Sequence, residues 1–493
     1  MNAAYVNSQD FSFFNDASEQ LNSMVDHLSS DIPLGEEHGA VEQYIQQEGY
    51  ELLRRLLQGH LNLRAEQETR QYGVTNAQGE NLIHCRENTQ RTVTSLFGEV
   101  KVTRKRYSQR KMKGEHPLDK DLNLAKDQFS DGIRLRVAEQ INHCAYDHVA
   151  EQIAKTTGAQ VAKRQCLNLV QDIAWDFEGY YLQNRYQEPE PTNDLLVLTF
   201  DGKGIVMRPD SLRECTKKRA KKSNKLNSRL SAGEKRDRKR MAQVASVYTV
   251  LAHQRSAESI MQNEQGESIH ALRTPARNKR VWASVDRAPK AVITEAFEEA
   301  LQRDPQQKRH WVVVIDGQPA QRKMIEKVAS EFKVNVTIVM DFIHVLEYLW
   351  KAAWCFFDKG DNAVEAWVAK YAVKILKGGC SQVAKGLRQS ATKRKLTKRD
   401  GVDSCAKYLV KNKERLRYDE ALASGFPIAS GIIEGACRHL INDRLDITGA
   451  RWGLNGAEAL LKLRSLKSSG DFDNYWLFHK EQSKQRCYTF KAA

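Results

Sequence analysis

The stretch VLTFDGKGIVMR, residues 197–208, begins as a buried strand and then interrupts its own apolar pattern with an acid. Asp201 follows four apolar or β-branched residues, Gly202 and Gly204 stand close to it, and the apolar pattern resumes at Ile205. An Asp-Gly pair favours a hairpin turn. The alternative is a metal ligand on a rigid strand, with glycines that let a bulky group come close. The stretch alone leaves both interpretations open.

Four more strand patterns and one amphipathic helix follow this stretch. They come in the order strand, strand, helix, strand, strand, at residues 244–253, 279–286, 289–303, 309–320 and 334–345. Three strands, a helix, and two strands separated by a helix are the order expected of a ribonuclease-H-like mixed sheet. From about residue 342 to 425 the pattern is helical and rich in lysine, which predicts an all-helical insertion after the fifth strand.

Acids stand at the ends of these predicted strands. Asp201 and Asp316 each precede a glycine after an apolar run, and neighbouring strands would bring their carboxylates to one edge of the sheet. A third acid is needed to complete a site for two metal ions. Glu434 is the better candidate, although by itself an (i, i+4) ion pair with Arg438 is the simpler explanation for it. Asp341 also ends a strand, but it suits the N-cap of the helix that follows.

The charge of the chain indicates a polyanionic partner. The net charge is +15, and residues 213–240 contain thirteen Lys or Arg against three acids. Such a balance favours nucleic acid. We expect this basic stretch to be mobile without DNA and to clamp phosphates without reading sequence, the alternative being a merely solvated loop. The cations expected to make these contacts are Lys217, Lys218, Arg219, Lys221 and Lys222.

Upstream of the sheet, the pattern predicts a DNA-binding domain. Residues 91–107 alternate as a basic β-hairpin, and residues 131–178 form a helical region in which Gly158 separates two helices. This is helix-turn-helix spacing, although any short helical hairpin looks similar. The first positions of the second helix, where a recognition helix presents its base-reading residues, are Lys163, Arg164 and Gln165.

Changes in composition and boundary stretches divide the chain into six parts. A polar, Pro-containing stretch at 186–194 separates the DNA-binding region from the sheet, and residues 1–38 are polar, acidic and expected to be loosely ordered. The expected parts are a partly disordered N-terminal helical region (1–90), the basic hairpin with the helix-turn-helix (91–185), a ribonuclease-H-like core in two pieces (194–345 and 426–466), the helical insertion (346–425) and a C-terminal tail (467–493).

Several protein classes are disfavoured. No apolar run is long enough for a membrane-spanning helix, and the N-terminus lacks the pattern of a signal peptide. The nine cysteines are scattered without a Cys-x-x-Cys pair, which disfavours a zinc ribbon and fits a reducing compartment. We therefore expect a cytoplasmic protein with no membrane partner.

Four motifs together resemble a known family. They are DGKG (201–204), VVVIDGQ (312–318), DFIHVLEYLW (341–350) and SGIIEGACRHLINDRLDITGARWG (430–453). The set resembles the ISKra-type insertion-sequence transposases, which belong with the Mutator-like group of DDE transposases. The most specific element is Glu-Gly followed by Arg-x-x-x-x-Gly-x-x-Trp, and the resemblance extends over about residues 93–464.

The resemblance implies a DNA transposase of a bacterial insertion sequence. Its substrates would be the terminal inverted repeats of the element and target DNA. Asp201, Asp316 and Glu434 match the family's catalytic acids and would hold two Mg²⁺ (or Mn²⁺) ions. Water would nick the strand at the element's end, and the freed 3′-hydroxyl would attack target DNA. The family also implies a homodimer or larger oligomer on DNA, associated with the nucleoid in the cytoplasm.

Further residues near these motifs are candidates for DNA contacts. Lys203 beside Asp201 contacts a phosphate or points to solvent. Phosphate contacts, and stacking on a base or ribose for the tryptophan, are expected of Arg438, Arg444, Arg451 and Trp452, the alternative for Trp452 being a place in the core. The wider superfamily has Cys-x-x-His after the fifth strand, where this chain has Asp341 and His344, whose role stays open. The cysteine-rich knuckle of some relatives is absent from residues 107–122.

Two other functions compete with transposition. A sequence-specific DNA-binding regulator, such as a domesticated transposase, would have lost one of the three acids, and none is missing. A ribonuclease-H-like nuclease or resolvase would keep the acids, but it would need neither a sequence-reading domain nor a long insertion. Terminal inverted repeats and a short target duplication beside the gene would discriminate between these functions.

Overall fold

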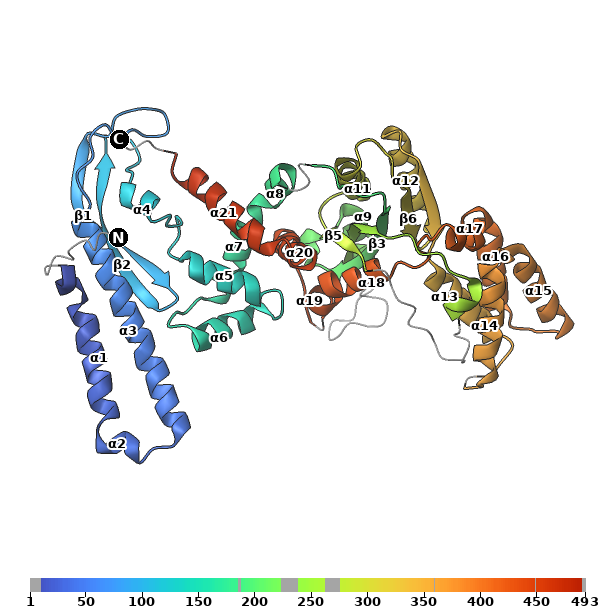
Figure 1. The fold of residues 1–493 in the computed structure, drawn as a ribbon, viewed down its shortest axis with the longest axis horizontal. Coiled ribbons are helices and arrows are strands. Elements are labelled where there is room, and N and C mark those ends of the chain that lie inside the picture. Colours follow the sequence, from blue (N-terminus) through green and yellow to red (C-terminus); the bar gives the residue numbers. More distant parts are fainter. Residues whose placement is uncertain are drawn as a thin grey trace. The chain divides into compact units, whose positions relative to one another are not determined.

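The computed structural model describes residues 10–184, 188–222, 238–261, 275–358, 360–447 and 449–489 (Figure 1). The chain forms two compact units, which are described separately. Unit 1 comprises residues 1–180 and 473–493, and unit 2 comprises residues 181–472. Across the described ranges, none of the helices is both long and apolar enough to cross a membrane. All nine cysteines are free thiols.

Unit 1 begins with a helical hairpin, which differs from the loose order expected for residues 1–38. After a 3₁₀ turn at Asp10–Phe14, α1 (Asn15–Leu28) and α3 (His38–Glu66) run antiparallel and are joined by the short α2 (Asp31–Leu34) (Figure 1). Buried side chains three and four residues apart hold α1 in place, namely Ala17, Gln20 and Met24. A narrow stripe of buried residues is thus enough to order a helix of polar composition.

The predicted basic hairpin is present and packs against α3. Its strands are β1 (His84–Ser95) and β2 (Gly98–Ser108), antiparallel and joined by Leu96 and Phe97. The N–H of Gly158 donates to the carbonyl of Leu96 at 2.9 Å, and a Cβ on Gly158 would lie only 2.4 Å from the carbonyl oxygen of Phe97. Only glycine allows this close approach. The core under the hairpin consists of Leu61, Val93, Val100, Val102 and Leu118, the last on α4 (Pro117–Asp121).

Three helices follow the hairpin, and two of them form the predicted helix-turn-helix. They are α5 (Asp131–Gln140), α6 (Tyr146–Thr156) and α7 (Lys163–Ile173). Each helix contacts the other two. They enclose a small apolar core made by Ile133, Val137, Val149, Ile153, Leu169 and Val170.

The segment expected to be a C-terminal tail is mostly helical. The expected tail contains α21 (Phe472–Cys487). Earlier in the chain, α7 is followed by a 3₁₀ turn at Ala174–Asp176 and by α8 (Phe177–Asn184). Within unit 1, Tyr475 of α21 donates its hydroxyl to the carbonyl of Ile173, and His479 Nδ1 lies 2.7 Å from Asp176. Residues near the end of the sequence therefore complete the core of the N-terminal unit.

Unit 2 is built on a five-stranded mixed sheet. The strands are β3 (Leu195–Val206), β4 (Lys239–Val250), β5 (Arg277–Ser284), β6 (Trp311–Ile315) and β7 (Val336–Met340). Their order is β5-β4-β3-β6-β7, with antiparallel pairing among the first three and parallel pairing of β3 with β6 and of β6 with β7. This is the ribonuclease-H-like mixed sheet that the sequence predicts.

The strand that carries Asp201 runs on without a turn. All twelve residues of β3 pair with β4, including Asp201 with Val244, so the hairpin interpretation of Asp201-Gly202 is wrong. The parallel pairing of β3 with β6 stops at Thr199. Asp201 therefore lies where β3 extends past the end of its parallel neighbour.

Unit 2 has two sets of helices: those in the connections between strands of the sheet, and those of the predicted insertion. The connections within the sheet contain a 3₁₀ turn (Pro209–Ser211), α9 (Glu214–Lys222), α10 (Ala257–Met261), α11 (Pro289–Arg303) and α12 (Pro319–Glu331). The insertion contains α13 (Phe342–Ala353), α14 (Ala363–Leu376), α15 (Cys380–Lys393), α16 (Asp400–Asn412), a 3₁₀ turn (Lys413–Arg415) and α17 (Tyr418–Ala423). The chain then continues through α18 (Gly431–Cys437), a π-helical turn (Arg438–Asn442), α19 (Asp443–Leu445) and α20 (Leu454–Ser469).

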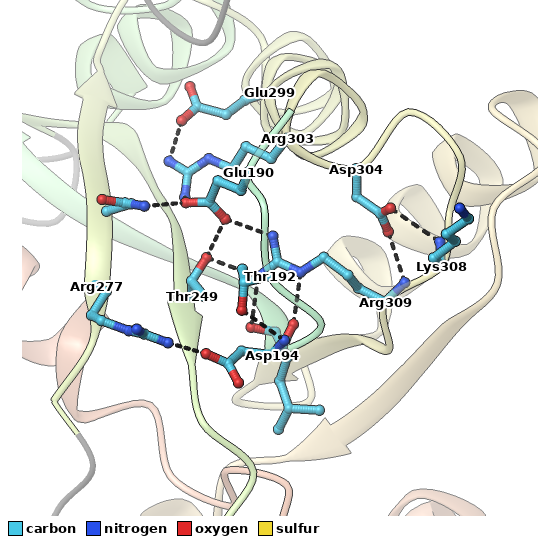
Figure 2. A network of polar contacts seen from close by, with 12 residues as sticks. Glu190, Thr192, Asp194, Thr249, Arg277, Glu299, Arg303, Asp304, Lys308 and Arg309 are labelled. Carbon is cyan, nitrogen blue, oxygen red and sulfur yellow. Dashed lines mark hydrogen bonds and ion pairs between the residues drawn. The ribbon is translucent and has the colours of Figure 1, made fainter. Parts of the chain in front are cut away.

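A network of buried polar contacts closes the sheet at the amino ends of β3 and β6 (Figure 2). Glu190 accepts hydrogen bonds from Thr249 at 2.5 Å and Arg309 at 2.6 Å. Arg309 also donates to the carbonyl of Asp194 at 2.7 Å, just before β3 begins. Burial raises the pKa of Glu190, but hydrogen bonds from Thr249, Asn278 and Arg309 outweigh it and lower the pKa below 4.5. Glu190 is therefore a firmly ionised structural group.

Candidate functional site

Three aspartates lie just beyond the point where the parallel pairing of β3, β6 and β7 ends in unit 2. Thr199 pairs with Val314, and Ile315 pairs with Met340. If these registers continued, Asp201 would be level with Asp316 and Asp316 level with Asp341; these three positions are called the row below. The N–H of Asp341 donates to the carbonyl of Ile315 at 2.7 Å, which extends the ladder to this row. The carboxyl ends of parallel strands, where this row lies, are the usual place for ligands in open α/β sheets.

Asp201 is half-buried and is held by uncharged donors. One carboxylate oxygen accepts the N–H of Gly202 at 2.6 Å, and the other accepts the thiol of Cys437, on α18, at 3.0 Å. Burial raises the pKa of the Cys437 thiol, and the charge of Asp201 raises it further. Cys437 therefore stays protonated and donates, which connects α18 directly to β3.

Asp316 begins the loop after β6. It is half-buried, and one carboxylate oxygen accepts the N–H of Gln318 at 3.1 Å. Gly317 has a φ of 93°, a left-handed conformation that favours glycine and turns the chain sharply away from the sheet. The glycine of this Asp-Gly pair therefore does serve a turn, unlike Gly202 in the middle of β3.

Asp341 is fully buried and joins the insertion to the sheet. Its carboxylate accepts the N–H of Ile343 at 2.8 Å and so caps α13, as the N-cap interpretation predicts. Its second oxygen accepts both the hydroxyl and the N–H of Ser430, the residue just before α18. Asp341 thus fixes the start of the helix that carries Glu434.

Glu434 projects from the first turn of α18 and is exposed. Burial raises its pKa, Asp341 and Asp201 raise it further, and His344 opposes them. The electrostatic neighbours of Glu434 therefore include two acids of the row. The ion pair with Arg438 does not form, because Arg438 lies 3.8 Å from Asp443 instead. Within the described ranges, the Glu434 carboxylate forms no ion pair with a lysine or an arginine.

Carboxylates are chemically suitable ligands for Mg²⁺, which prefers oxygen and keeps several of its own waters. The charges of Asp341 and Asp201 both raise the pKa of Glu434, and the register of β3 with β6, if continued, would put Asp316 level with Asp201. Among the described residues, however, no three acidic, histidine or cysteine side chains converge closely enough to enclose a metal ion. The donor set fits a hydrated divalent ion held by one or two carboxylates at a time.

Of the other residues predicted near the acids, some remain at or near the surface of unit 2 and others are buried. Lys203 on β3 is half-buried, Arg451 is exposed, and His344 on α13 lies 3.4 Å from Glu347. These three remain at or near the surface. Glu434 and Arg438 also border a cavity of about 980 Å³ on this side of unit 2.

The expectation that Arg444 and Trp452 contact DNA is corrected by their burial. Their exposed fractions are 3% and 8%, and the Arg444 guanidinium lies over the Trp452 ring at 5.1 Å. The indole N–H donates to the carbonyl of Leu445 at 3.1 Å, and the Trp452 backbone bonds to Val206 and Arg208. Neither side chain has a face left for a phosphate or a base, so the core alternative holds.

The basic stretch at 213–240 is only partly described, because residues 223–237 lie outside the described ranges. Its first part is helical rather than a loop, since Glu214–Lys222 form α9, with Thr216 and Ala220 buried. Lys217 pairs with Glu214 at 2.9 Å. The side chains that α9 leaves exposed are Lys218, Arg219, Lys221 and Lys222.

In unit 1, the three predicted base-reading residues begin α7 as expected. Two of them have structural partners, because Lys163 pairs with Asp147 at 2.7 Å and Gln165 accepts the N–H of Ala162 at 3.0 Å. Arg164 is exposed.

Sequence reasoning missed two residues of the site, Cys437 and Ser430. Both lie in the SGIIEGAC motif, and Cys437 comes three residues after Glu434, on the same helical face. That spacing was a usable signal for Cys437. No local pattern could reveal Ser430, whose partner Asp341 lies 89 positions away.

Comparisons with known proteins give little further information. No protein-family model matches the chain, and no curated protein matches it. Among solved structures it is weakly similar to the Drosophila P element transposase strand transfer complex, with a TM-score of 0.25 and 9% sequence identity. That match covers 72% of this chain and 81% of the other chain. A TM-score this low is not an argument for a shared activity.

Proposed function

We propose that this protein is a DNA transposase of the DDE class, encoded by a bacterial insertion sequence. Asp201, Asp316 and Glu434 are its catalytic acids. The observation that carries the proposal is their placement: β3, the end of β6 and α18 each bring one acid to the carboxyl edge of a ribonuclease-H-like sheet. None of the three carboxylates is neutralised by a cation of the described chain.

The chain's own groups divide the work of the reaction. The three acids hold two Mg²⁺ or Mn²⁺ ions, which when bound supply an activated water and support for the leaving oxygen. Lys203, two residues after Asp201 on β3, and Arg438, which borders the same cavity as Glu434, would bind DNA phosphates beside the acids, and the exposed Arg451 would bind a phosphate near the far end of β3. Arg164 and the rest of α7 read the ends of the element. The protein works as a homodimer or larger assembly on DNA.

The decisive experiment removes each acid with the smallest change of shape. Asp201→Asn, Asp316→Asn and Glu434→Gln should each lower Mg²⁺-dependent cleavage at least ~10³-fold, because removing one essential charge at a reaction centre costs on the order of 4 kcal/mol. The substrate is a plasmid that carries the DNA flanking the gene. Binding to the same DNA, measured by gel shift, should change less than about threefold.

Asp210→Asn is the matched control, since Asp210 is an exposed acid that follows β3. Its cleavage rate should stay at the wild-type level. Normal cleavage by Glu434→Gln would refute its place among the ligands and favour Asp341. Wild-type protein that binds the flanking DNA without cleaving it would favour a regulator, and cleavage without strand transfer would favour a nuclease.

A further inference from the structure

Two tyrosines of the helical insertion donate hydrogen bonds to the backbone at the carboxyl edge of the sheet. Tyr408, on α16, donates its hydroxyl to the carbonyl of Asp316 at 3.4 Å. Tyr418, on α17, donates its hydroxyl to the carbonyl of Met340 at 2.9 Å, and Met340 is the residue before Asp341. The insertion therefore holds the backbone at the ends of both β6 and β7.

The Tyr408 ring is restrained by a second ring of the insertion. Tyr348, on α13, stacks on it, with the ring centroids 4.2 Å apart and the ring planes 20° from parallel. Both rings are half-buried, and α13 and α16 pack against each other. Because stacked aromatic rings attract each other in a defined geometry, the Tyr408 hydroxyl is held in a fixed direction toward the Asp316 turn.

The turn that accepts this hydrogen bond passes close to the tyrosine. Gly317 has a left-handed φ of 93°, and a Cβ there would lie 3.4 Å from the Tyr408 hydroxyl oxygen and 2.2 Å from Cε of Met340. The Asp316 carboxylate accepts a hydrogen bond from the N–H of Gln318, which belongs to the same turn. Tyr408 is therefore the side chain that ties this turn to the insertion.

Both tyrosine hydroxyls are permanent donors. Burial raises the pKa of Tyr408, and the neighbouring Tyr348 and Asp316 raise it further. Burial likewise raises the pKa of the fully buried Tyr418 well above its ordinary value. Both tyrosines therefore stay protonated at neutral pH and donate to the two carbonyls.

We propose that Tyr408 is a positioning residue for Asp316, because its hydroxyl fixes the carbonyl of Asp316 and thereby the direction in which the carboxylate of the same residue points. Its consequence for metal binding rests on the proposed function, in which Asp316 is a metal ligand. Partners that orient a metal ligand typically change metal affinity or activity 10–100-fold when they are mutated. The insertion thus builds part of the site, and Tyr418 supports the backbone before Asp341 in the same way.

The first test needs neither metal nor DNA. Tyr408→Phe keeps the stacked ring and removes only the hydroxyl. Hydrogen exchange of the full-length chain, followed by mass spectrometry, should be about fivefold faster for the amides of residues 316–318, because one hydrogen bond that holds the turn is lost. Tyr348→Phe is the matched control, since within the described ranges the Tyr348 hydroxyl has no hydrogen-bond partner, and its exchange should equal that of the wild type.

The second test measures the consequence for the metal with Mg²⁺ alone. The Mg²⁺ concentration that gives half of the rise in melting temperature should be about tenfold higher for Tyr408→Phe than for the wild type or Tyr348→Phe. At a fixed low Mg²⁺ concentration kcat for DNA cleavage should fall, while DNA affinity stays unchanged. A hydroxyl with a merely structural role would lower the melting temperature without metal and leave the half-saturating Mg²⁺ concentration where it is.

The two tests separate this proposal from the proposed function. Wild-type exchange of residues 316–318 in Tyr408→Phe would overturn the positioning role, and so would faster exchange with an unchanged Mg²⁺ requirement. If Mg²⁺ does not stabilise the wild type and Asp316→Asn cleaves DNA normally, the proposed function fails and the metal role of Tyr408 fails with it. The exchange experiment would still decide whether the Tyr408 hydroxyl holds the turn.

Discussion

Carboxylates lie at both ends of the unit 2 sheet, but they are paired with arginines at one end and not at the other. At the amino ends of β3 and β6, Glu190 pairs with Arg309 and Glu299 pairs with Arg303 (Figure 2). Glu299 also pairs with Arg280. At the carboxyl ends, Asp201 and Asp316 accept only uncharged donors of the described chain. One sheet thus has a neutralised end and an end with excess negative charge.

This difference separates structural acids from candidate functional ones. An uncompensated charge that is withdrawn from water costs several kcal/mol, and a fold that only needed stability would pair it or replace it. The amino end does pair its acids. The carboxyl end leaves the half-buried Asp201 and Asp316 with only uncharged donors of the described chain, and burial and the charges of Asp341 and Asp201 raise the pKa of Glu434. Such a conflict with local stability is expected where a ligand supplies the missing positive charge.

The largest effect in this comparison is expected at the neutralised end. Arg309→Met leaves Glu190 buried without its main cation and should destabilise unit 2 by about 3–5 kcal/mol, measured by calorimetry of the full chain. Adding Glu190→Gln to Arg309→Met should recover part of this loss, since both charges are then gone. Lys308→Met, at an exposed neighbouring position, should change the stability by less than about 0.5 kcal/mol. Equal effects at positions 308 and 309 would contradict the distinction between the two ends.

A smaller effect is expected at Asp341, which is buried and hydrogen-bonded like the acids of the amino end but lies at the carboxyl end of the sheet. Ser430→Ala removes a hydroxyl donor from this buried carboxylate and should cost about 1.5–3 kcal/mol. Because Ser430 precedes the helix of Glu434, the variant should also lower kcat for DNA cleavage while leaving DNA affinity unchanged. Ser430→Thr, which keeps the hydroxyl, should restore most of the rate, and Ser424→Ala at an exposed site is the control. Failure of threonine to rescue would mean that the hydroxyl does not position Glu434.

The smallest effect is expected from adding metal to the negative end. At ten times its Kd, Mg²⁺ should stabilise the wild type by about 1.4 kcal/mol, visible as a rise in melting temperature. In Asp201→Asn this rise should be absent, because one of the proposed ligands is lost. The variant without metal should be at least as stable as the wild type, since it loses a carboxylate that has no cation. An equal Mg²⁺ response in both proteins would place the ion elsewhere.

The sheet was predictable because its strands are long apolar runs with clear interruptions. The helix predicted at 289–303 matches α11, and the predicted order of strands and insertion is confirmed. The middle of β3 was harder, because Asp-Gly is a turn signal in most contexts. Here the pairing of all twelve residues with β4 overrides that local preference.

The candidate site was predictable only in part, because its geometry depends on register. The sequence pointed to Asp201 and Asp316, but their positions relative to Asp341 depend on the registers of β3 with β6 and of β6 with β7. The burial of Arg444 against Trp452 could not be predicted either, because nothing in the sequence distinguishes a buried arginine from an exposed one within a basic motif. A helical N-terminal region was predicted, but the order of its first helices was not, because that order depends on contacts between α1 and α3.

The hydrogen bonds at Asp341 also bear on how the protein could have evolved. The chain leaves the sheet there and returns at Ser430, and Phe342 donates to the carbonyl of Ile428 at 2.8 Å, so both ends of the insertion are tied together at its base. Closing a longer loop costs little extra entropy, only about 0.6 kcal/mol for each doubling of its length. An insertion closed at its base in this way can differ in length at little entropic cost, because the start of α18 stays bonded to Asp341 at the edge of the sheet.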